Sequence, residues 1–213
     1  QILKWLPSLL LLLSLFGCTP TPPPQERFVV QVDSTRAAVL ADSIRQSVAA
    51  VVADGLELSL WAVDSLAPDP IALTMDYQGR AYITRTHRQK NSEFDVRGHR
   101  DWIEASLGFE TVEDRRAFLR EIFDSTRSEE NVWLPDLNGD SLHDWRDLAV
   151  EKEEVWRIED VSGDGLADQA LRVVQDFHEE ITDVAGAVMV RGEDMFVGVG
   201  PDLWRLQDRS GEG

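Results

Sequence analysis

Apolar residues recur along the first part of the chain with the period of a helix. From Ser34 to Ala53 they recur at helical spacing, at Val39, Leu40, Ile44, Val48, Val51 and Val52. This spacing predicts an amphipathic helix that has Ser34 as its N-cap and Gly55 as its stop. A short strand is expected just before it, over residues 27–32.

Further along, the pattern changes to the alternation that is typical of strands. Residues 56–63 alternate in this way, and residues 71–75 and 80–84 predict a β-hairpin around the turn at 76–79. Residues 185–191 and 195–199 repeat the hairpin design, and a further strand is expected around Trp204. The chain is therefore expected to be mainly β.

Between these strands lies a segment with a helical pattern, at about 85–130. Residues 101–107 predict a short helix, and Thr111 with Asp114 approximates a capping box that opens a second one. The apolar face of this second helix holds Phe118, Leu119, Ile122 and Phe123. A basic cluster leads into the insert, formed by Arg85, His87, Arg88, Arg97, His99 and Arg100. Such a cluster could meet an anionic ligand, but pairing with nearby carboxylates is the commoner role.

Two acidic loops of one design organise the middle of the chain. The first runs from Asp136 to Asp144 and the second from Asp160 to Asp168. Oxygen-bearing side chains occupy positions 1, 3, 5 and 9 of both, and position 7 can offer its backbone carbonyl. The candidate ligands are Asp136, Asn138, Asp140, Leu142 and Asp144 in the first loop, and Asp160, Ser162, Asp164, Leu166 and Asp168 in the second.

This oxygen spacing favours calcium, a hard cation that binds oxygen ligands in tight, glycine-containing loops. Position 12, which is a bidentate glutamate in an EF-hand, is Asp147 in the first loop and Leu171 in the second, so neither loop is an EF-hand. The alternative is a pair of Asx turns, because Asp, Asn, Ser and Gly dominate turns in any case.

The strand that precedes the second loop is repeated 48 residues later. Val155-Trp156-Arg157-Ile158 is echoed by Leu203-Trp204-Arg205-Leu206, and acidic and glycine residues follow both stretches. This period lies within the range of one propeller blade. Because the sequence stops inside the third acidic stretch, we expect a fragment of a longer protein.

The composition limits the choice of partners. The chain has 213 residues, a hydrophobic content of 43% and a formal net charge of −18. Such acidity argues against nucleic acid or an anionic membrane surface as a partner, and it fits cation binding. The single cysteine excludes an internal disulfide or a C-x-x-C-H haem site in this stretch.

The N-terminus has the pattern of a targeting segment. Lys4 precedes an apolar run that ends at Gly17-Cys18. The run resembles a bacterial lipoprotein signal over residues 1–18, which implies a lipidated Cys18, a proline-rich tether over 19–26 and an envelope protein anchored in a membrane. A plain secretory signal is the alternative. Residues 27–55 then form a strand and helix spacer, and residues 56–213 form the main domain.

From about Leu56 onward the chain resembles a family of bacterial envelope β-propellers, the membrane-bound dehydrogenases related to glucose/sorbosone dehydrogenases. The resemblance lies in residues 70–84, 155–168, 185–188, 195–198 and 201–208. It implies the N-terminal blades of a truncated β-propeller, interrupted by the helical insert. The insert and the helix after Ser34 are not explained by the family pattern.

The same resemblance implies a function. It points to a quinone-dependent dehydrogenase of a sugar or another alcohol, with pyrroloquinoline quinone as cofactor and the catalytic base beyond residue 213. His178 is the nearest candidate base in this stretch, although a histidine beside acidic residues is more often a surface residue. The first loop also resembles the calcium loops of integrin-type repeats, which implies a non-catalytic adhesion module as the alternative. Fold alone does not decide between the two.

Overall fold

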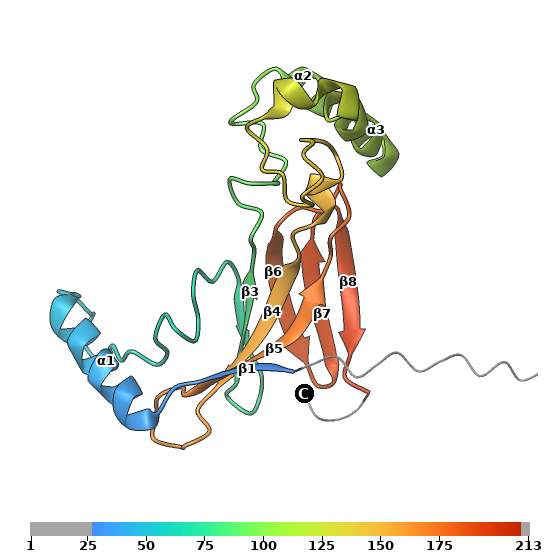
Figure 1. Cartoon of the computed structure of the whole chain (residues 1–213). Helices are drawn as coiled ribbons and strands as arrows, with labels where there is room; N and C mark the ends of the chain where they lie inside the picture. The colour runs from blue at the N-terminus through green and yellow to red at the C-terminus, as the bar shows by residue number, and fades with distance from the viewer. Residues whose placement is uncertain (1–26, 210–213) are drawn as a thin grey trace, which may run out of the picture.

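A computed structural model describes residues 27–209 and shows two antiparallel sheets (Figure 1). The first sheet has the strand order β1-β5-β4-β3-β2 and the second has the order β6-β7-β8. The strands are β1 (Phe28–Gln31), β2 (Leu73–Met75), β3 (Ala81–Arg85), β4 (Glu153–Glu159), β5 (Gln169–Asp176), β6 (Ala185–Arg191), β7 (Asp194–Val199) and β8 (Asp202–Gln207). The helices are α1 (Ser34–Ser47), α2 (Trp102–Leu107) and α3 (Val112–Ile122), with short 3₁₀ turns at Ser125–Asn131 and Asp147–Ala149.

The expectation of a partial β-propeller is wrong. The described residues form two stacked sheets, of five and three strands, and no ring of blades. The first sheet also recruits β1 from the N-terminal segment, which pairs with β5. A repeated strand-and-turn pattern predicts individual strands correctly, but it does not fix how many sheets form or how they close.

Several local expectations are confirmed. Both hairpins form, and α3 opens with the expected capping box, in which Thr111 and Asp114 bond each other's backbone N–H. The first helix is shorter than predicted: Asp33, not Ser34, is its N-cap, and it ends at Ser47. The β-branched valines after Ser47 favour extended backbone, which explains the early end.

Two strand assignments differ from the sequence-based expectation. Residues 56–63 form irregular backbone and no strand. The segment nevertheless packs against the first sheet through Val63, and the Trp61 carbonyl accepts the backbone N–H of Ala167, just before β5, at 2.8 Å. Strand β5 was not anticipated, because Arg172 and Gln175 interrupt its apolar residues. It nevertheless lies inside the first sheet, between β1 and β4.

Both faces of the first sheet are covered. On one face, Ile83, Trp156 and Ile158 form a buried core with Val63 and Leu66, and Leu40 and Ile44 of α1 pack against it. On the other face, Tyr82 and Val155 pack against Ala185, Val197 and Val199 of the second sheet. The first sheet is therefore the central layer of the molecule.

The second sheet repeats the layout of the first. Strands β6, β7 and β8 follow one another as β2, β3 and β4 do, and the sequence echo aligns Trp204 with Trp156. Trp156 points to the side of the first sheet that α1 covers, whereas Trp204 contacts Phe177 at the end of β5, with ring centroids 5.5 Å apart. The two equivalent tryptophans thus point in the same direction through the stack, Trp156 toward the side that α1 covers and Trp204 toward the first sheet.

Residues 86–152 form a lobe at one end of the sheets, called here the insert lobe (Figure 1). Trp102, Leu119, Phe123, Leu134 and Leu148 make its own buried core. The helices dock on the segment after β5 through ion pairs, since Arg116 and Arg120 both reach the buried carboxylate of Glu180.

Arg88 closes the neck of the insert lobe. Its side chain is fully buried and donates to the carbonyls of Leu148 and Glu151 at 2.7 Å each, and to that of Phe177 at 3.3 Å. The guanidinium also lies 3.5 Å from the carboxylate of Glu153, which is buried as well. Burial raises the pKa of the Glu153 carboxyl, although Thr86, the Ala185 N–H and Arg88 act in the opposite direction.

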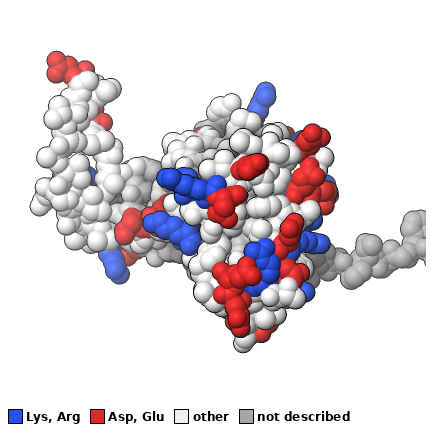
Figure 2. Space-filling view, turned by 90° about the horizontal axis from the view of Figure 1, so that it is seen from above, with Lys and Arg blue, Asp and Glu red and all other residues white. Residues whose placement is uncertain are grey.

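On the face that Figure 2 shows, charged side chains of both signs lie side by side over the body of the molecule. Within residues 27–209, no helix is both long enough and apolar enough to cross a membrane.

Candidate functional site

The first acidic loop is held by its own backbone amides. The Asp136 carboxylate accepts the N–H groups of Gly139 (2.7 Å), Asp140 (3.2 Å) and Ser141 (3.0 Å). Asn138 and Asp140 at positions 3 and 5 are exposed and hydrogen-bonded to each other. Leu142 donates its N–H to Asp140, which leaves its carbonyl as the expected position-7 donor.

The second loop repeats this arrangement at the other end of the first sheet, between β4 and β5. The Asp160 carboxylate accepts the N–H groups of Gly163 (2.7 Å), Asp164 (3.3 Å) and Gly165 (2.8 Å). The Ser162 hydroxyl also donates to Asp160, at 3.2 Å. Leu166 donates its N–H to Asp164, as Leu142 does to Asp140.

The backbone of the two loops coincides at the turn positions. Position 4 has positive φ in both, with values of 77° at Gly139 and 75° at Gly163. Position 6 does too, with 91° at Gly165 and 69° at Ser141. Only glycine takes this conformation without strain, so Ser141 is held in it by the surrounding hydrogen bonds.

The position-9 residues of the two loops do not play equivalent parts. Asp168 is buried and accepts the N–H groups at positions 2 and 3 of its loop, from Val161 and Ser162. Asp144 is also buried, but it accepts from Ser125 and pairs with Arg146 at 2.6 Å. It therefore points away from the loop interior.

In the first loop, Asp147 fills the place that Asp168 has in the second. Its carboxylate accepts the N–H groups of Leu137 (2.8 Å) and Asn138 (3.1 Å), again at positions 2 and 3. Asp147 also accepts the N–H of Asp144 at 3.0 Å and is fully buried. Sequence reasoning placed Asp147 at position 12 and omitted it from the ligand set.

Both loops have the oxygen chemistry of a calcium site. Each presents exposed oxygen-bearing side chains at positions 3 and 5 near the position-1 aspartate, Asn138 and Asp140 in the first loop and Ser162 and Asp164 in the second. Across residues 27–209, however, no three His, Cys, Asp or Glu side chains are gathered closely enough to hold a metal ion. The loop amides instead neutralise the first aspartate, as Asx turns do.

Hydrogen bonding sets the acidity of Asp160. Partial burial works to raise its pKa, but the N–H groups of Gly165 and Gly163 and the Ser162 hydroxyl outweigh it, so the pKa lies below its usual value. The carboxylate form is therefore the one that the folded loop stabilises.

A cleft opens between the two sheets, on the side where β8 faces β5. The sheets are in close contact along β6, which packs on β2 and β3. Toward β8 they leave one space of about 650 Å³ at the end of β5 and another of about 870 Å³ further along the same strands. Val173, Val174 and Gln175 of β5 and Leu206 and Gln207 of β8 line both spaces.

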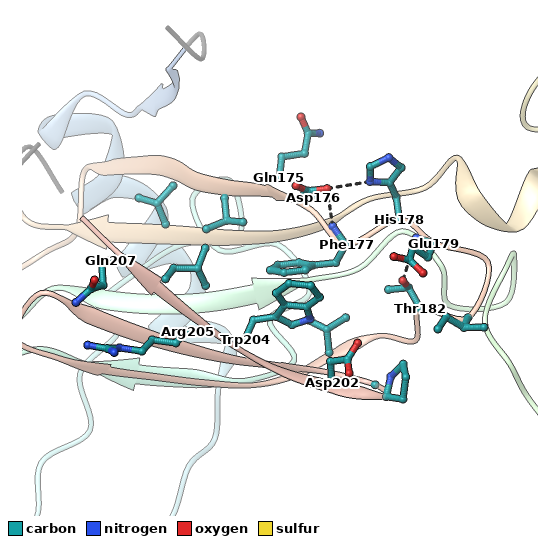
Figure 3. A pocket seen from close by; sticks show the side chains of 17 residues that line it. Gln175, Asp176, Phe177, His178, Glu179, Thr182, Asp202, Trp204, Arg205 and Gln207 are labelled. Atoms are coloured by element: carbon teal, nitrogen blue, oxygen red, sulfur yellow. Dashed lines mark hydrogen bonds and ion pairs between the residues drawn. The ribbon is translucent and has the colours of Figure 1, made fainter. Parts of the chain in front are cut away.

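The mouth of the cleft combines an aromatic pair with acidic groups (Figure 3). Phe177 and Trp204 lie together in its middle, and Asp176 and Asp202 lie on either side of them. His178, the nearest candidate base, is half exposed, and its Nδ1 lies 2.9 Å from the Asp176 carboxylate. The structure thus joins His178 to a carboxylate at the edge of a cleft.

The basic cluster is largely neutralised by carboxylates. Arg88 lies against Glu153, Arg85 lies 3.7 Å from Glu154, and Arg97 pairs with Asp95 at 2.7 Å. This confirms the expected pairing for these three arginines. Cys18, the signal and the tether lie outside the described residues, as does the end of the third acidic stretch.

Comparison with protein-family models, with curated proteins and with solved structures found no match for this chain.

Proposed function

We propose that this chain is a calcium-stabilised, non-catalytic binding module of the bacterial cell envelope, and that the cleft between β5 and β8 is its ligand site. The cleft carries the proposal. It is open between two sheets that are otherwise packed, and it offers an aromatic pair beside hydrogen-bonding side chains, as binding sites commonly do.

Calcium would stabilise the fold of the module and would not contact the ligand in the cleft. The two acidic loops lie at different ends of the first sheet, one in the insert lobe and one between β4 and β5. In each loop a cation would sit near the carboxylates of positions 1 and 5, the oxygen at position 3 and the carbonyl at position 7. It would relieve the repulsion between these carboxylates and fix the loop.

Thermal unfolding with calcium, with magnesium and with a chelator tests the calcium part. Calcium at about 100 times its dissociation constant should stabilise the chain by roughly 2.7 kcal/mol for each independent site. Magnesium should do so poorly, because it demands tighter octahedral geometry. Asp164→Ala should weaken the response, whereas Glu129→Ala, which removes an exposed carboxylate outside both loops, should leave it intact. A melting temperature indifferent to calcium would reduce both loops to Asx turns.

A second candidate function is catalytic, and one observation favours it. The His178–Asp176 pair resembles a base with its orienting carboxylate, and it lies beside a cleft. This arrangement would suit proton removal from a sugar or another alcohol by a quinone-dependent dehydrogenase, with pyrroloquinoline quinone as electron acceptor. Dye reduction by the purified chain with quinone and a panel of sugars tests it. Turnover by the native chain that is lost in His178→Ala would favour the catalytic function over the binding function.

A further inference from the structure

The outer edge of strand β8 pairs with no other strand among the described residues, whereas the equivalent edge in the first sheet is paired. Its equivalent in the first sheet, β4, pairs with β3 on one side and with β5 on the other. Strand β8 pairs with β7 on one side, and among the described residues no strand lies on its other side. A backbone edge of this kind is a template for another strand.

The first sheet shows which side chains such a strand needs. Arg172 of β5 lies directly opposite Trp156 in the strand register, and its guanidinium is 6.0 Å from the tryptophan ring. The same arginine pairs with Glu154 at 3.1 Å, while the Trp156 indole N–H donates to Glu154 at 2.7 Å. A basic residue, an aromatic ring and a carboxylate thus lock β5 onto β4.

Strand β8 carries the aromatic ring and the carboxylate of this arrangement. Asp202 and Trp204 stand two residues apart on one face, as Glu154 and Trp156 do, at the same offset of 48 residues. Trp204 is 45% exposed, whereas Trp156 is packed into the core on the α1 side of the first sheet and is 4% exposed. On the opposite side the cleft is lined by the Asp176 carboxylate, so its charge also favours a basic occupant, whereas the Glu179 carboxylate there is paired with Arg116 at 2.7 Å.

We propose that the β8 edge binds an extended segment of a partner polypeptide in antiparallel register, with an arginine or lysine opposite Trp204 and apolar residues on either side. The backbone of the partner would extend the second sheet, and its basic side chain would enter the cleft between Trp204 and Asp202. This inference rests on the proposed binding function and specifies the ligand of the cleft.

A labelled peptide with the sequence of residues 168–177, which contains β5, is the probe, and fluorescence anisotropy on the full chain measures its binding. We expect Trp204→Ala to weaken binding by about tenfold, the loss expected for a desolvated cation–π contact. Asp202→Asn should weaken it by roughly three- to tenfold through the lost charge-assisted contact. Met189→Ala, on the outer face of the same sheet, is the matched control and should change nothing.

One change is made in the peptide alone, so the test does not depend on the folding of any variant. Arg172→Glu in the peptide should reduce binding to the native chain by about tenfold or more. Hydrogen exchange should show new protection in β8 when the native peptide is added. Protection that appears only in β4, with no effect of Trp204→Ala, would mean that the peptide displaces the chain's own β5, and would overturn the proposal.

Three other outcomes would also overturn it. One is absence of binding at peptide concentrations up to about 1 mM, the range of very weak complexes. The second is self-association through β8 that is lost in Trp204→Ala while the peptide does not bind, since the occupant would then be a second copy. The third is protection of the cleft by a sugar but not by the peptide. The calcium response is measured separately, so failure of this inference is distinguishable from failure of the calcium-stabilised fold.

Discussion

Asp147 and Asp168 make the same contacts in two different loops, although they stand at positions 12 and 9. Each is buried and accepts the backbone N–H groups of the second and third loop residues. Both loops are therefore closed by the same kind of contact, a buried aspartate that accepts two backbone N–H groups, although this aspartate stands at a different position in each loop.

Removing the Asp147 carboxylate should destabilise the first loop. Asp147→Ala leaves three backbone N–H groups without their acceptor, so we expect a loss of about 1–3 kcal/mol in the free energy of unfolding. Asp147→Asn keeps an accepting oxygen and should recover much of the loss. Urea unfolding of both variants and of Glu129→Ala checks this. An Asp147→Ala variant as stable as Glu129→Ala would contradict the assigned contacts.

The strained serine of the first loop predicts an unusual gain. Ser141 has φ of 69°, where its counterpart in the second loop is Gly165. We expect Ser141→Gly to stabilise the chain by about 0.5–1 kcal/mol, because relief of the left-handed strain exceeds the added flexibility of the unfolded chain. Gly165→Ser should lose a similar amount. Opposite signs in chemical unfolding are the expected result, and equal signs would show that the loops differ in conformation.

The buried pair at the neck predicts strong coupling between two residues. Arg88→Met leaves Glu153 buried without its cation and removes three bonds to carbonyls, so we expect a loss of about 3–5 kcal/mol. Arg88→Met with Glu153→Gln should cost less than the two single changes together. Arg97→Ala, whose side chain is 78% exposed, should cost less than about 1 kcal/mol. Additive single and double changes would show that the two groups do not interact.

Acid should release the second loop. The folded-state pKa of Asp160 lies below the unfolded value of 3.8, so its contribution to stability is present above that pH. The contribution is lost as the pH falls through the lower folded-state pKa. Between about pH 5 and about pH 2, in chelator, Asp160→Asn should therefore lose less stability than the native chain. Parallel losses in urea unfolding would contradict this assignment.

The lipid anchor is tested by cell fractionation. If Cys18 carries lipid, Cys18→Ser should move the protein from the membrane fraction to the soluble envelope fraction. Ser14→Ala, inside the apolar run, is a control that should not change the distribution. Membrane association that persists in Cys18→Ser would remove the lipoprotein interpretation.

The sequence predicted those features that depend on neighbouring residues. Thr111 and Asp114 lie three positions apart and form the expected capping box, and the spacing of the acidic loops placed Asp136 and Asp160 at matching turns. It could not identify Asp147 as the partner of positions 2 and 3, because a 3₁₀ turn brings that carboxylate back to the loop. Strand β5 was missed for another reason: Arg172 and Gln175 interrupt its apolar residues, so the segment lacks the alternation of a half-buried strand.

The cleft was also beyond prediction. Phe177 and Trp204 are far apart in the sequence, and only the packing of the second sheet on the first brings them together. The propeller expectation failed at the same level, because sheet number and closure are long-range properties. The echo of Trp156 in Trp204 did hold information, since it marks the equivalent strands of the two sheets.

The closed neck of the insert lobe also bears on the order in which the chain folds. Strands β3 and β4 are neighbours in the sheet, yet residues 86–152 separate them. Closing an unstructured loop of that length costs about 2–3 kcal/mol more than closing a turn of four residues. The lobe has its own core of Trp102, Leu119 and Phe123, and Arg88 ties its two ends together. Once folded, it is in effect the turn of a β3–β4 hairpin, so changes in its core should slow assembly of the central sheet as well as weaken the lobe.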